Sequence, residues 1–257
     1  MVASYPEVQG GGSLILAWQI KNKNVLVVGG GEVAAGRVLN LLNADARVTV
    51  VCPKEGLNDE VAFRIQQGQV QHLNRVFLPI DLEPEKNVAM VLTAIDDPDA
   101  STRIWKYCKK VKVPANIADV PPECDFYFGS VHRDGPLQIM VSTNGNGPRL
   151  AAAIRRQIGD MLPAGTGDSI KKVGQLRRKL RRIAPGKGTE DISSRMTWMS
   201  KVCDQWSTEE FNAMDDEDMD ELVSYYTEGT VPSFESIRLG SKDEAVVWEF
   251  DGSFGWM

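Results

Sequence analysis

Three consecutive glycines, Gly29, Gly30 and Gly31, separate an apolar stretch at residues 24–28 from an Ala/Leu-rich stretch that runs to about residue 43. The first stretch is typical of a buried β-strand, and the apolar spacing of the second indicates a helix. The glycines and the three residues after them have the form G-x-G-x-x-A. Such a turn lets backbone N–H groups approach a pyrophosphate at a helix N-terminus. We therefore predict a dinucleotide site; a glycine-rich turn without a ligand is the alternative.

The first half of the chain alternates between short apolar stretches and helical patterns, which predicts parallel crossover units and a Rossmann-like, doubly wound α/β sheet. The expected strands are residues 13–18, 24–28, 47–52, 70–73, 88–95 and 114–118, with a turn at 21–23 between the first two. The expected helices are residues 33–43, 57–67 and 98–110.

The texture changes after Asp119. Two further strands are expected at 125–132 and 136–142, with a turn at 133–135, and helices at 148–162, 168–184, 189–206 and 208–227. We therefore place a dinucleotide-binding domain at residues 1–116, a small central α/β region at 117–147 and a helical C-terminal domain at 148–229. An acidic, aromatic tail of open order, with Trp248, Phe250, Phe254 and Trp256, follows at 230–257.

Composition restricts the class of protein. The chain has 257 residues, of which 42% are apolar and 25% charged, as in ordinary globular proteins. It has no apolar run near the roughly 20 residues of a membrane span, and its start lacks the pattern of a signal peptide. Four dispersed cysteines and two histidines offer neither a zinc framework nor a disulfide scaffold. We expect a cytoplasmic protein without a resident metal.

Charge is distributed unevenly along the chain. The net charge is −6, but residues 209–257 hold fourteen acidic and two basic residues, so the preceding part sums to +6. A generic nucleic-acid binder would carry an overall basic face without such an acidic block. We expect no nucleic-acid partner, although the basic part can recognise a smaller polyanion.

The end of the second expected strand does not identify the cofactor. NAD sites typically have an acidic residue here to accept the ribose hydroxyls. This strand ends instead in Cys52, Pro53 and Lys54. Lys54 would suit a 2′-phosphate, or it is simply a solvated loop lysine.

Asp119 closes the segment Asn116–Asp119, at the carboxyl end of a short expected strand. Ligands of open α/β sheets bind beyond such ends, where a carboxylate can act as a general base or hold a cation. The alternative is an aspartate that caps a turn. Nearby Cys124 is best explained as a structural thiol, and His132 as a structural histidine rather than a metal ligand.

Two further segments can bind anions. The polar loop from Ser142 opens a helix, so that its amides either grip an anion or only cap the helix. That helix carries Arg149, Arg155 and Arg156, and residues 171–182 include seven basic side chains. This second basic run can meet a polycarboxylate, be solvated, or dock on the acidic residues 209–221.

Together these segments resemble the siroheme synthase dehydrogenase/chelatase family, in particular its fungal-type bifunctional precorrin-2 dehydrogenase and sirohydrochlorin ferrochelatase. The resemblance covers roughly residues 13–205 and rests on the order and spacing of five segments. They are the early strand and turn before residues 25–34 (VLVVGGGEVA), and residues 92–97 (LTAIDD), 116–119 (NIAD), 124–128 (CDFYF) and 141–151 (VSTNGNGPRLA). The tail beyond about residue 229 has no match in it.

The resemblance implies NAD as cofactor, a tetrapyrrole substrate, ferrous iron as a second substrate, and an interlocked homodimer built on the central region. It implies that Asp119 is catalytic. The expected cofactor-binding residues are Gly29, Gly30, Gly31, Glu32, Val33, Cys52, Pro53, Lys54 and Thr93. The expected substrate-binding residues are Asn116, Ser142, Thr143, Asn144, Gly145, Arg149, Arg155 and Arg156. Bacterial relatives can be phosphorylated on a serine at the position of Thr143, so the same regulation is in doubt here.

The function predicted is therefore oxidation of precorrin-2 to sirohydrochlorin, followed by iron insertion. Two alternatives stay open: a dehydrogenase that leaves iron insertion to another protein, and a non-catalytic NAD-sensing module.

Overall fold

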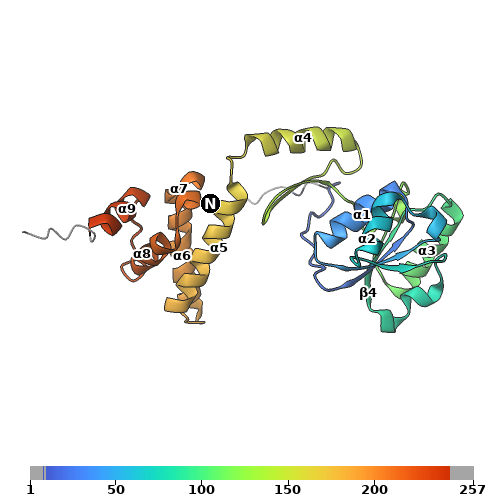
Figure 1. The fold of residues 1–257 in the computed structure, drawn as a ribbon, viewed down its shortest axis with the longest axis horizontal. Helices are drawn as coiled ribbons and strands as arrows, with labels where there is room; N and C mark the ends of the chain where they lie inside the picture. Colours follow the sequence, from blue (N-terminus) through green and yellow to red (C-terminus); the bar gives the residue numbers. More distant parts are fainter. Residues whose placement is uncertain (1–7, 9, 244–257) are drawn as a thin grey trace, which may run out of the picture. The chain divides into compact units, whose positions relative to one another are not determined.

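The computed structural model describes residue 8 and residues 10–243. Contacts divide the chain into two compact units (Figure 1). Unit 1 contains the described residues up to Phe128 together with Thr143–Gly147, and unit 2 contains Gly129–Ser142 and the described residues from Pro148 onward. Residues 117–128 thus make their contacts in unit 1, while the domain limits drawn from the sequence stay a prediction.

Unit 1 is built on a parallel five-stranded sheet with the order β3-β2-β1-β4-β5. Strand β1 (Asn24–Val28) lies at its centre and pairs with β2 (Arg47–Val51) and β4 (Val88–Thr93). Strands β3 (Gln71–Leu73) and β5 (Ala115–Ile117) form the two edges. The chain starts outward from β1 in one direction and later in the other, so the sheet has a topological switch point between β1 and β4.

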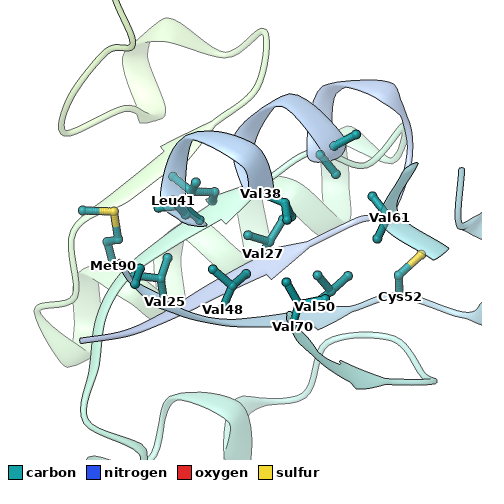
Figure 2. Close-up of a cluster of buried hydrophobic side chains, with 14 of the residues drawn as sticks. Val25, Val27, Val38, Leu41, Val48, Val50, Cys52, Val61, Val70 and Met90 are labelled. Carbon is teal, nitrogen blue, oxygen red and sulfur yellow. The ribbon is translucent and has the colours of Figure 1, made fainter. Parts of the chain in front are cut away.

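Helices cover both faces of this sheet, because alternate residues of each strand point to opposite sides. On one face Val25, Val27 and Val50 pack against Val38 and Leu41 of α1 (Glu32–Leu42), as Figure 2 shows. The helix α2 (Asp59–Gln66) packs on this face through Val61. The other face, with Leu26, Val91 and Ile117, packs against Ile104 and Cys108 of α3 (Pro98–Val111). The predicted doubly wound α/β fold is confirmed.

Short 3-10 turns complete the connections of unit 1: η1 (Lys54–Gly56), η2 (Pro79–Leu82), η3 (Pro84–Lys86) and η4 (Pro121–Glu123). Asp81 fixes η2, because its two carboxylate oxygens accept hydrogen bonds from Arg75 at 2.8 and 2.5 Å. Burial alone would raise the pKa of Asp81, but the hydrogen bonds from Arg75 and the Leu78 N–H hold it below its ordinary value.

The predicted strand at residues 13–18 is wrong. This segment has no strand structure, and Leu14 is 83% exposed. The physical reason is that β1, its expected partner, pairs with a parallel neighbour on each side and offers no free edge. Instead, Trp18 packs edge-on against Phe126, with 5.3 Å between the ring centroids.

Unit 2 begins with an antiparallel hairpin of β6 (Ser130–Asp134) and β7 (Leu137–Val141). Its loop is formed by Gly135 and Pro136, rather than by residues 133–135 as expected. Residues 125–129, expected in the first strand, lie outside it. Their polar groups are engaged with β5: Asp125 accepts a hydrogen bond from the Ala115 N–H, and the Phe126 carbonyl accepts one from Asn116.

The remainder of unit 2 is helical, as predicted. The helices are α4 (Pro148–Met161), α5 (Thr166–Ile183), α6 (Thr189–Gln205), α7 (Thr208–Ala213), α8 (Asp216–Ser224) and α9 (Phe234–Asp243). The single helix expected at 208–227 is broken, because Asp215 accepts hydrogen bonds from the Glu217 and Asp218 N–H groups and so caps a new helix. Among the described residues, no helix has the length and apolar character needed to cross a bilayer.

The core of unit 2 extends into the segment that we described as an acidic tail. Trp198 and Trp206 donate hydrogen bonds to the carbonyls of Thr230 and Pro232. Ile237 of α9 is buried with Leu176 and Leu180 of α5 and with residues of α6 to α8. The tail's aromatic residues Trp248, Phe250, Phe254 and Trp256 lie outside the described residues.

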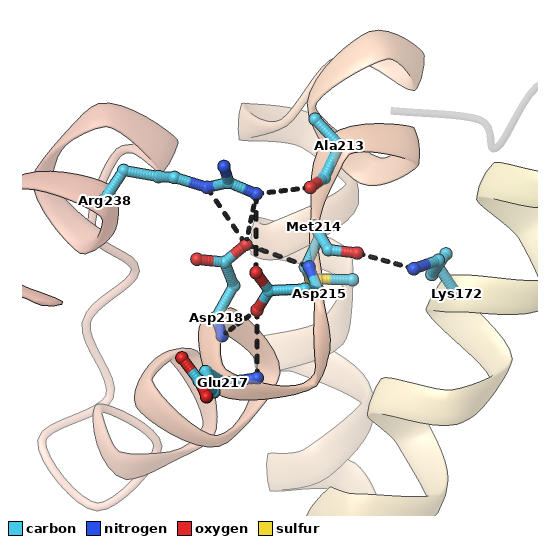
Figure 3. Close-up of polar contacts among 7 residues, drawn as sticks. All are labelled: Lys172, Ala213, Met214, Asp215, Glu217, Asp218 and Arg238. Carbon is cyan, nitrogen blue, oxygen red and sulfur yellow. Dashed lines mark hydrogen bonds and ion pairs between the residues drawn. The ribbon is translucent and has the colours of Figure 1, made fainter.

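Acidic and basic segments of unit 2 are paired with one another. Lys179 of the basic run forms ion pairs with Asp216 and Asp220, and Lys172 donates a hydrogen bond to the Met214 carbonyl. Arg238 of α9 contacts Asp218 at 2.9 Å (Figure 3). Of the three roles considered for residues 171–182, docking on the acidic segment therefore holds for these two lysines.

Candidate active site at the carboxyl edge of the sheet

Backbone hydrogen bonds join the carboxyl ends of the central strands to the loops that follow them. The Gly29 N–H donates to the Val51 carbonyl after β2, and the Ala94 N–H donates to the Val28 carbonyl of β1. The Ala118 N–H donates to the Thr93 carbonyl of β4. These bonds bring the glycine turn, the end of β4 and the segment before Asp119 to one edge, where ligands of open sheets bind.

Each of the three glycines has a different reason to be glycine. Gly29 has a φ of +114°, and a Cβ there would lie 2.0 Å from the Ala94 carbonyl oxygen. A Cβ on Gly30 would lie 2.8 Å from the Gly56 carbonyl oxygen. A Cβ on Gly31 would meet nothing within 4 Å, and Gly31 is exposed. Folding explains the first two glycines, whereas the space at Gly31 is what a ligand approaching the backbone needs.

Gly31 is also the N-cap of α1, and no side chain caps this helix end. The first N–H groups of a helix lack partners within the helix, and the helix dipole favours an anion near them. Glu32 and Val33, the first residues of α1, are exposed. The turn therefore fits the pyrophosphate of a dinucleotide.

The three residues after β2 are held mainly by their backbones. His72 Nε2 lies 2.8 Å from the Cys52 carbonyl oxygen, and the Lys54 N–H donates to Asn74 Oδ1 at 2.7 Å. Cys52 is buried beside Gly30, and burial together with the charge of Glu55 raises the pKa of its thiol. Pro53 and the exposed Lys54 side chain follow it, so both explanations of Lys54 stay open.

Thr93 ends β4 with a hydroxyl that lacks a partner. The residue is 2% exposed, and its Oγ1 has no hydrogen bond within the described part of the chain. A buried hydroxyl without a partner is costly. Its position at the end of β4, next to the glycine turn, suits a polar group of a bound cofactor.

Asp119 lies on a turn directly after β5. Its backbone is left-handed, with a φ of +60°, and the Val120 N–H closes the turn on the Ile117 carbonyl. The side chain is exposed and makes no hydrogen bond to another described residue. The carboxylate therefore does not cap the turn, which was the alternative explanation for this residue, and it is available to a ligand.

The residues around Asp119 are structural. Asn116 is buried, and its amide donates to the Phe126 carbonyl at 2.8 Å, so that this donor is already engaged within the protein. The Cys124 sulfur accepts a hydrogen bond from the Ile117 N–H and donates to the Ile117 carbonyl. Burial raises the pKa of the Cys124 thiol, which agrees with a structural role.

Arg37 of α1 is a site residue that our sequence reasoning missed. Its guanidinium carbon lies 4.0 Å from the centroid of the Phe128 ring. Burial lowers the pKa of Arg37, while the charges of Cys124 and Asp119 raise it, so these groups are neighbours. The only signal in the sequence is a cation one and a half turns into the helix after the glycines, which is hard to distinguish from a solvated charge.

The loop after Ser142 is tied to the N-terminal segment within unit 1. Asn144 donates to the Gly11 carbonyl at 2.9 Å and accepts from the Ser13 hydroxyl at 2.6 Å. Thr143 Oγ1 accepts a hydrogen bond from the Gly147 N–H at 3.1 Å, and Gly145 has a φ of +83°. These bonds support the local capping explanation of the loop, since the polar atoms they use are satisfied within the chain.

The three arginines after this loop belong to unit 2. Arg149, Arg155 and Arg156 lie on α4 and form no ion pair with another described residue. His132 of β6 packs where a Cβ on Gly159 of α4 would lie 2.8 Å from its Nδ1, which agrees with a structural histidine. Within the described ranges, no group of three or more His, Cys, Asp or Glu side chains is placed to hold a metal ion.

Comparison with known families accounts for most of the chain. Residues 16–130 match a model described as "Putative NAD(P)-binding". Residues 134–161 match "Sirohaem biosynthesis protein central", and residues 163–232 match "Sirohaem biosynthesis protein C-terminal".

Whole proteins give the same picture. The chain is 52% identical to a siroheme biosynthesis protein of Schizosaccharomyces pombe, over 96% of this chain and 93% of that protein. It is 30% identical to the siroheme biosynthesis protein of the same name in Saccharomyces cerevisiae, over 79% and 86% of the two chains. A solved structure named SirC, precorrin-2 dehydrogenase, aligns with a TM-score of 0.58 and 21% identity, covering 88% of this chain and 100% of that one. At this identity the structure shows a shared fold.

Proposed function

The chain belongs to the sirohaem biosynthesis protein family, and from this premise we propose that it is a bifunctional enzyme that makes sirohydrochlorin and then siroheme. In the first reaction precorrin-2 loses a hydride and a proton and becomes sirohydrochlorin. In the second, ferrous iron, a substrate, enters the macrocycle as two pyrrole N–H protons leave. The observation that carries the proposal is the exposed Asp119 carboxylate, without a hydrogen bond to another described residue, at the same sheet edge as Gly31.

NAD, when bound, supplies the hydride acceptor. The backbone at Gly29, Gly30 and Gly31 and the start of α1 at Glu32 and Val33 would hold its pyrophosphate. The segment of Cys52, Pro53 and Lys54 would lie along its ribose, and the Thr93 hydroxyl would gain the polar partner that it lacks among the described residues. No acidic residue selects NAD over NADP here, so the choice of NAD rests on the resemblance to the family.

Asp119 would accept the protons released in both reactions. A general base must be ionised and reachable by the substrate, and an exposed carboxylate without a hydrogen bond from another described residue meets both conditions. Because oxidation and chelation each require that protons leave the macrocycle, a single carboxylate can serve both reactions.

The macrocycle carries eight carboxylates and therefore requires cations and N–H donors. We propose that the loop residues Ser142, Thr143, Asn144 and Gly145, together with Asn116, lie along the substrate. Arg149, Arg155 and Arg156 of α4, which have no acidic partner among the described residues, would bind its carboxylates.

A paired assay tests the whole proposal. Precorrin-2 and NAD should give the absorption spectrum of sirohydrochlorin, and ferrous iron added afterwards should shift that spectrum to the one of siroheme. Oxidation without iron insertion above the uncatalysed rate would leave a dehydrogenase only. Failure of both reactions in a folded protein that binds NAD would favour the NAD-sensing module.

We also propose a homodimer built on the β6–β7 hairpin. A two-stranded hairpin is marginal by itself, and Val131 of β6 is 50% exposed, which supports a partner surface there. Light scattering at micromolar concentration should give twice the chain mass. A fully active monomer would contradict the proposal.

A further inference from the structure

Arg37 is held in a defined orientation by an aromatic wall. Its guanidinium lies over Phe128, Phe128 packs edge-on against Phe126 at 5.8 Å between centroids, and Phe126 packs edge-on against Trp18. Stacking on a ring uses the face of a guanidinium and leaves the N–H groups at its edge available. The wall therefore orients a fork of hydrogen-bond donors.

These donors have no acceptor within the described residues. Arg37 makes no hydrogen bond there and no ion pair within 4.0 Å, although it is half-buried. Asp119 is near enough for its charge to favour the charged form of Arg37, but the two groups do not meet that distance. A guanidinium in this state is a site for a planar anion, which a carboxylate matches with two parallel N–H···O bonds.

The neighbourhood identifies the anion. The space at Gly31 suits the cofactor pyrophosphate, whereas Arg37 faces Asp119, where protons leave the substrate in the proposed reactions. A substrate with eight carboxylates would raise the pKa of Asp119 by repulsion when it binds. A cation bound to one of those carboxylates would offset this effect and keep Asp119 ionised.

We propose that the Arg37 guanidinium, lying flat on Phe128, binds one carboxylate of the tetrapyrrole beside Asp119. This subsite rests on the proposed function and adds to it a residue that fixes the orientation of the macrocycle at the base. Arg37 would be both a substrate-binding residue and a positioning residue for Asp119.

The experiment compares Arg37→Met with Arg47→Met. Methionine keeps an unbranched apolar stem over Phe128 and removes the charge. Arg47 starts β2 at the opposite edge of the same sheet, is exposed, and forms no ion pair with a described residue, so its variant controls for a general loss of positive charge. The probe is uroporphyrin, an octacarboxylate macrocycle, with the tetracarboxylate coproporphyrin beside it, both titrated by quenching of tryptophan fluorescence.

Arg37→Met should weaken uroporphyrin binding by about 10- to 100-fold, the range for a lost charge-assisted pair. Arg47→Met should change it by less than about threefold, in line with a screened surface charge. Arg37→Lys should recover a large part of the affinity, and the NAD dissociation constant of Arg37→Met should stay within about twofold of wild type. The KM for precorrin-2 should rise more than kcat falls.

Equal losses in the Arg37 and Arg47 variants would overturn the proposal, because they would reveal only a general field. Weakened NAD binding with intact uroporphyrin binding would assign Arg37 to the cofactor instead. If Arg37→Met does not fold, Phe128→Leu, which keeps the charge and removes the stacking surface, should weaken uroporphyrin binding by about threefold; no loss would overturn the subsite. Failure of wild type in the paired assay, with uroporphyrin binding still dependent on Arg37, would reject the proposed reactions and not the subsite.

Discussion

Two arginines of this protein lie over phenylalanine rings, and their surroundings differ. In unit 2 Arg238 lies 5.1 Å from the Phe234 centroid and also contacts Asp218, which is 4% exposed, and the Ala213 carbonyl (Figure 3). In unit 1 Arg37 lies on Phe128 and has no hydrogen-bond acceptor among the described residues. The first arginine completes a fold, and the second presents donors to a ligand. Unsatisfied polar groups, more than charge itself, separate the candidate site from the scaffold.

The largest expected effect is at Asp119, the acid of the unsatisfied cluster. Asp119→Asn should lower the rates of oxidation and iron insertion by about 10²–10⁴-fold, the usual cost of losing a general base. Melting temperature and NAD affinity should hardly change, since asparagine also tolerates the left-handed backbone and no hydrogen bond to a described residue is lost. Both turnover rates, NAD titration and a melting curve on this one variant decide the matter. Near wild-type rates would remove Asp119 from the mechanism.

Gly31→Val should lower NAD affinity by about 100-fold or more. The added side chain occupies the space that the pyrophosphate needs, while the fold has no atom within 4 Å of the new Cβ. Iron insertion into supplied sirohydrochlorin should persist, because that step needs no nicotinamide. Gly30→Ala is the contrasting variant, since its Cβ would approach the Gly56 carbonyl, and here we expect lower stability. A folded Gly31→Val protein that loses both activities equally would argue against separate use of the cofactor.

Arg238→Met tests the satisfied cluster and should behave opposite to Arg37→Met. It leaves the buried Asp218 carboxylate without its cation, so the free energy of unfolding should fall by about 2–3 kcal/mol. Uroporphyrin and NAD affinities should match wild type at temperatures where the variant is folded. Denaturant unfolding and the two titrations supply the comparison. Loss of ligand affinity without loss of stability would contradict the distinction drawn between the two arginines.

The smallest expected effect concerns acid stability. The pKa of Asp81 is lowered in the folded protein, so its contribution is complete above the unfolded value near 3.9 and is lost as pH falls through the lower folded value. The free energy of unfolding should therefore decrease below about pH 4. Asp81→Asn should cost about 1–3 kcal/mol at pH 7 and flatten part of that decrease. Urea unfolding of both proteins from pH 3 to 7 provides the measurement, and parallel curves would count against the assignment.

Much of the fold follows from local pattern. Branched apolar runs and the glycine turn predicted β1, β2, β4 and β5 together with the helices between them, since these features act over a few residues. The strand expected at residues 13–18 failed for a non-local reason: its pattern was adequate, but β1 had no free edge. The predicted helix at 208–227 failed because one capping residue, Asp215, divides it.

The site was predictable to a different degree. Gly31 and Asp119 could be located because the loops after parallel strands share one edge. Arg37 could not, since its importance depends on Phe128, more than ninety residues later, and on the lack of an acceptor among its described neighbours. Sequence patterns place side chains on elements, but whether a polar group is satisfied depends on tertiary contacts.

The return of Thr143–Gly147 to unit 1 has a consequence for biosynthesis. Asn144 is hydrogen-bonded to Gly11 and Ser13, residues that leave the ribosome long before it. Unit 1 can therefore reach its final contacts only after the hairpin β6–β7 has been translated, and the segment around Gly11 and Ser13 lacks these partners until then. A fragment ended at residue 128 would retain the complete parallel sheet yet omit the loop that anchors this segment.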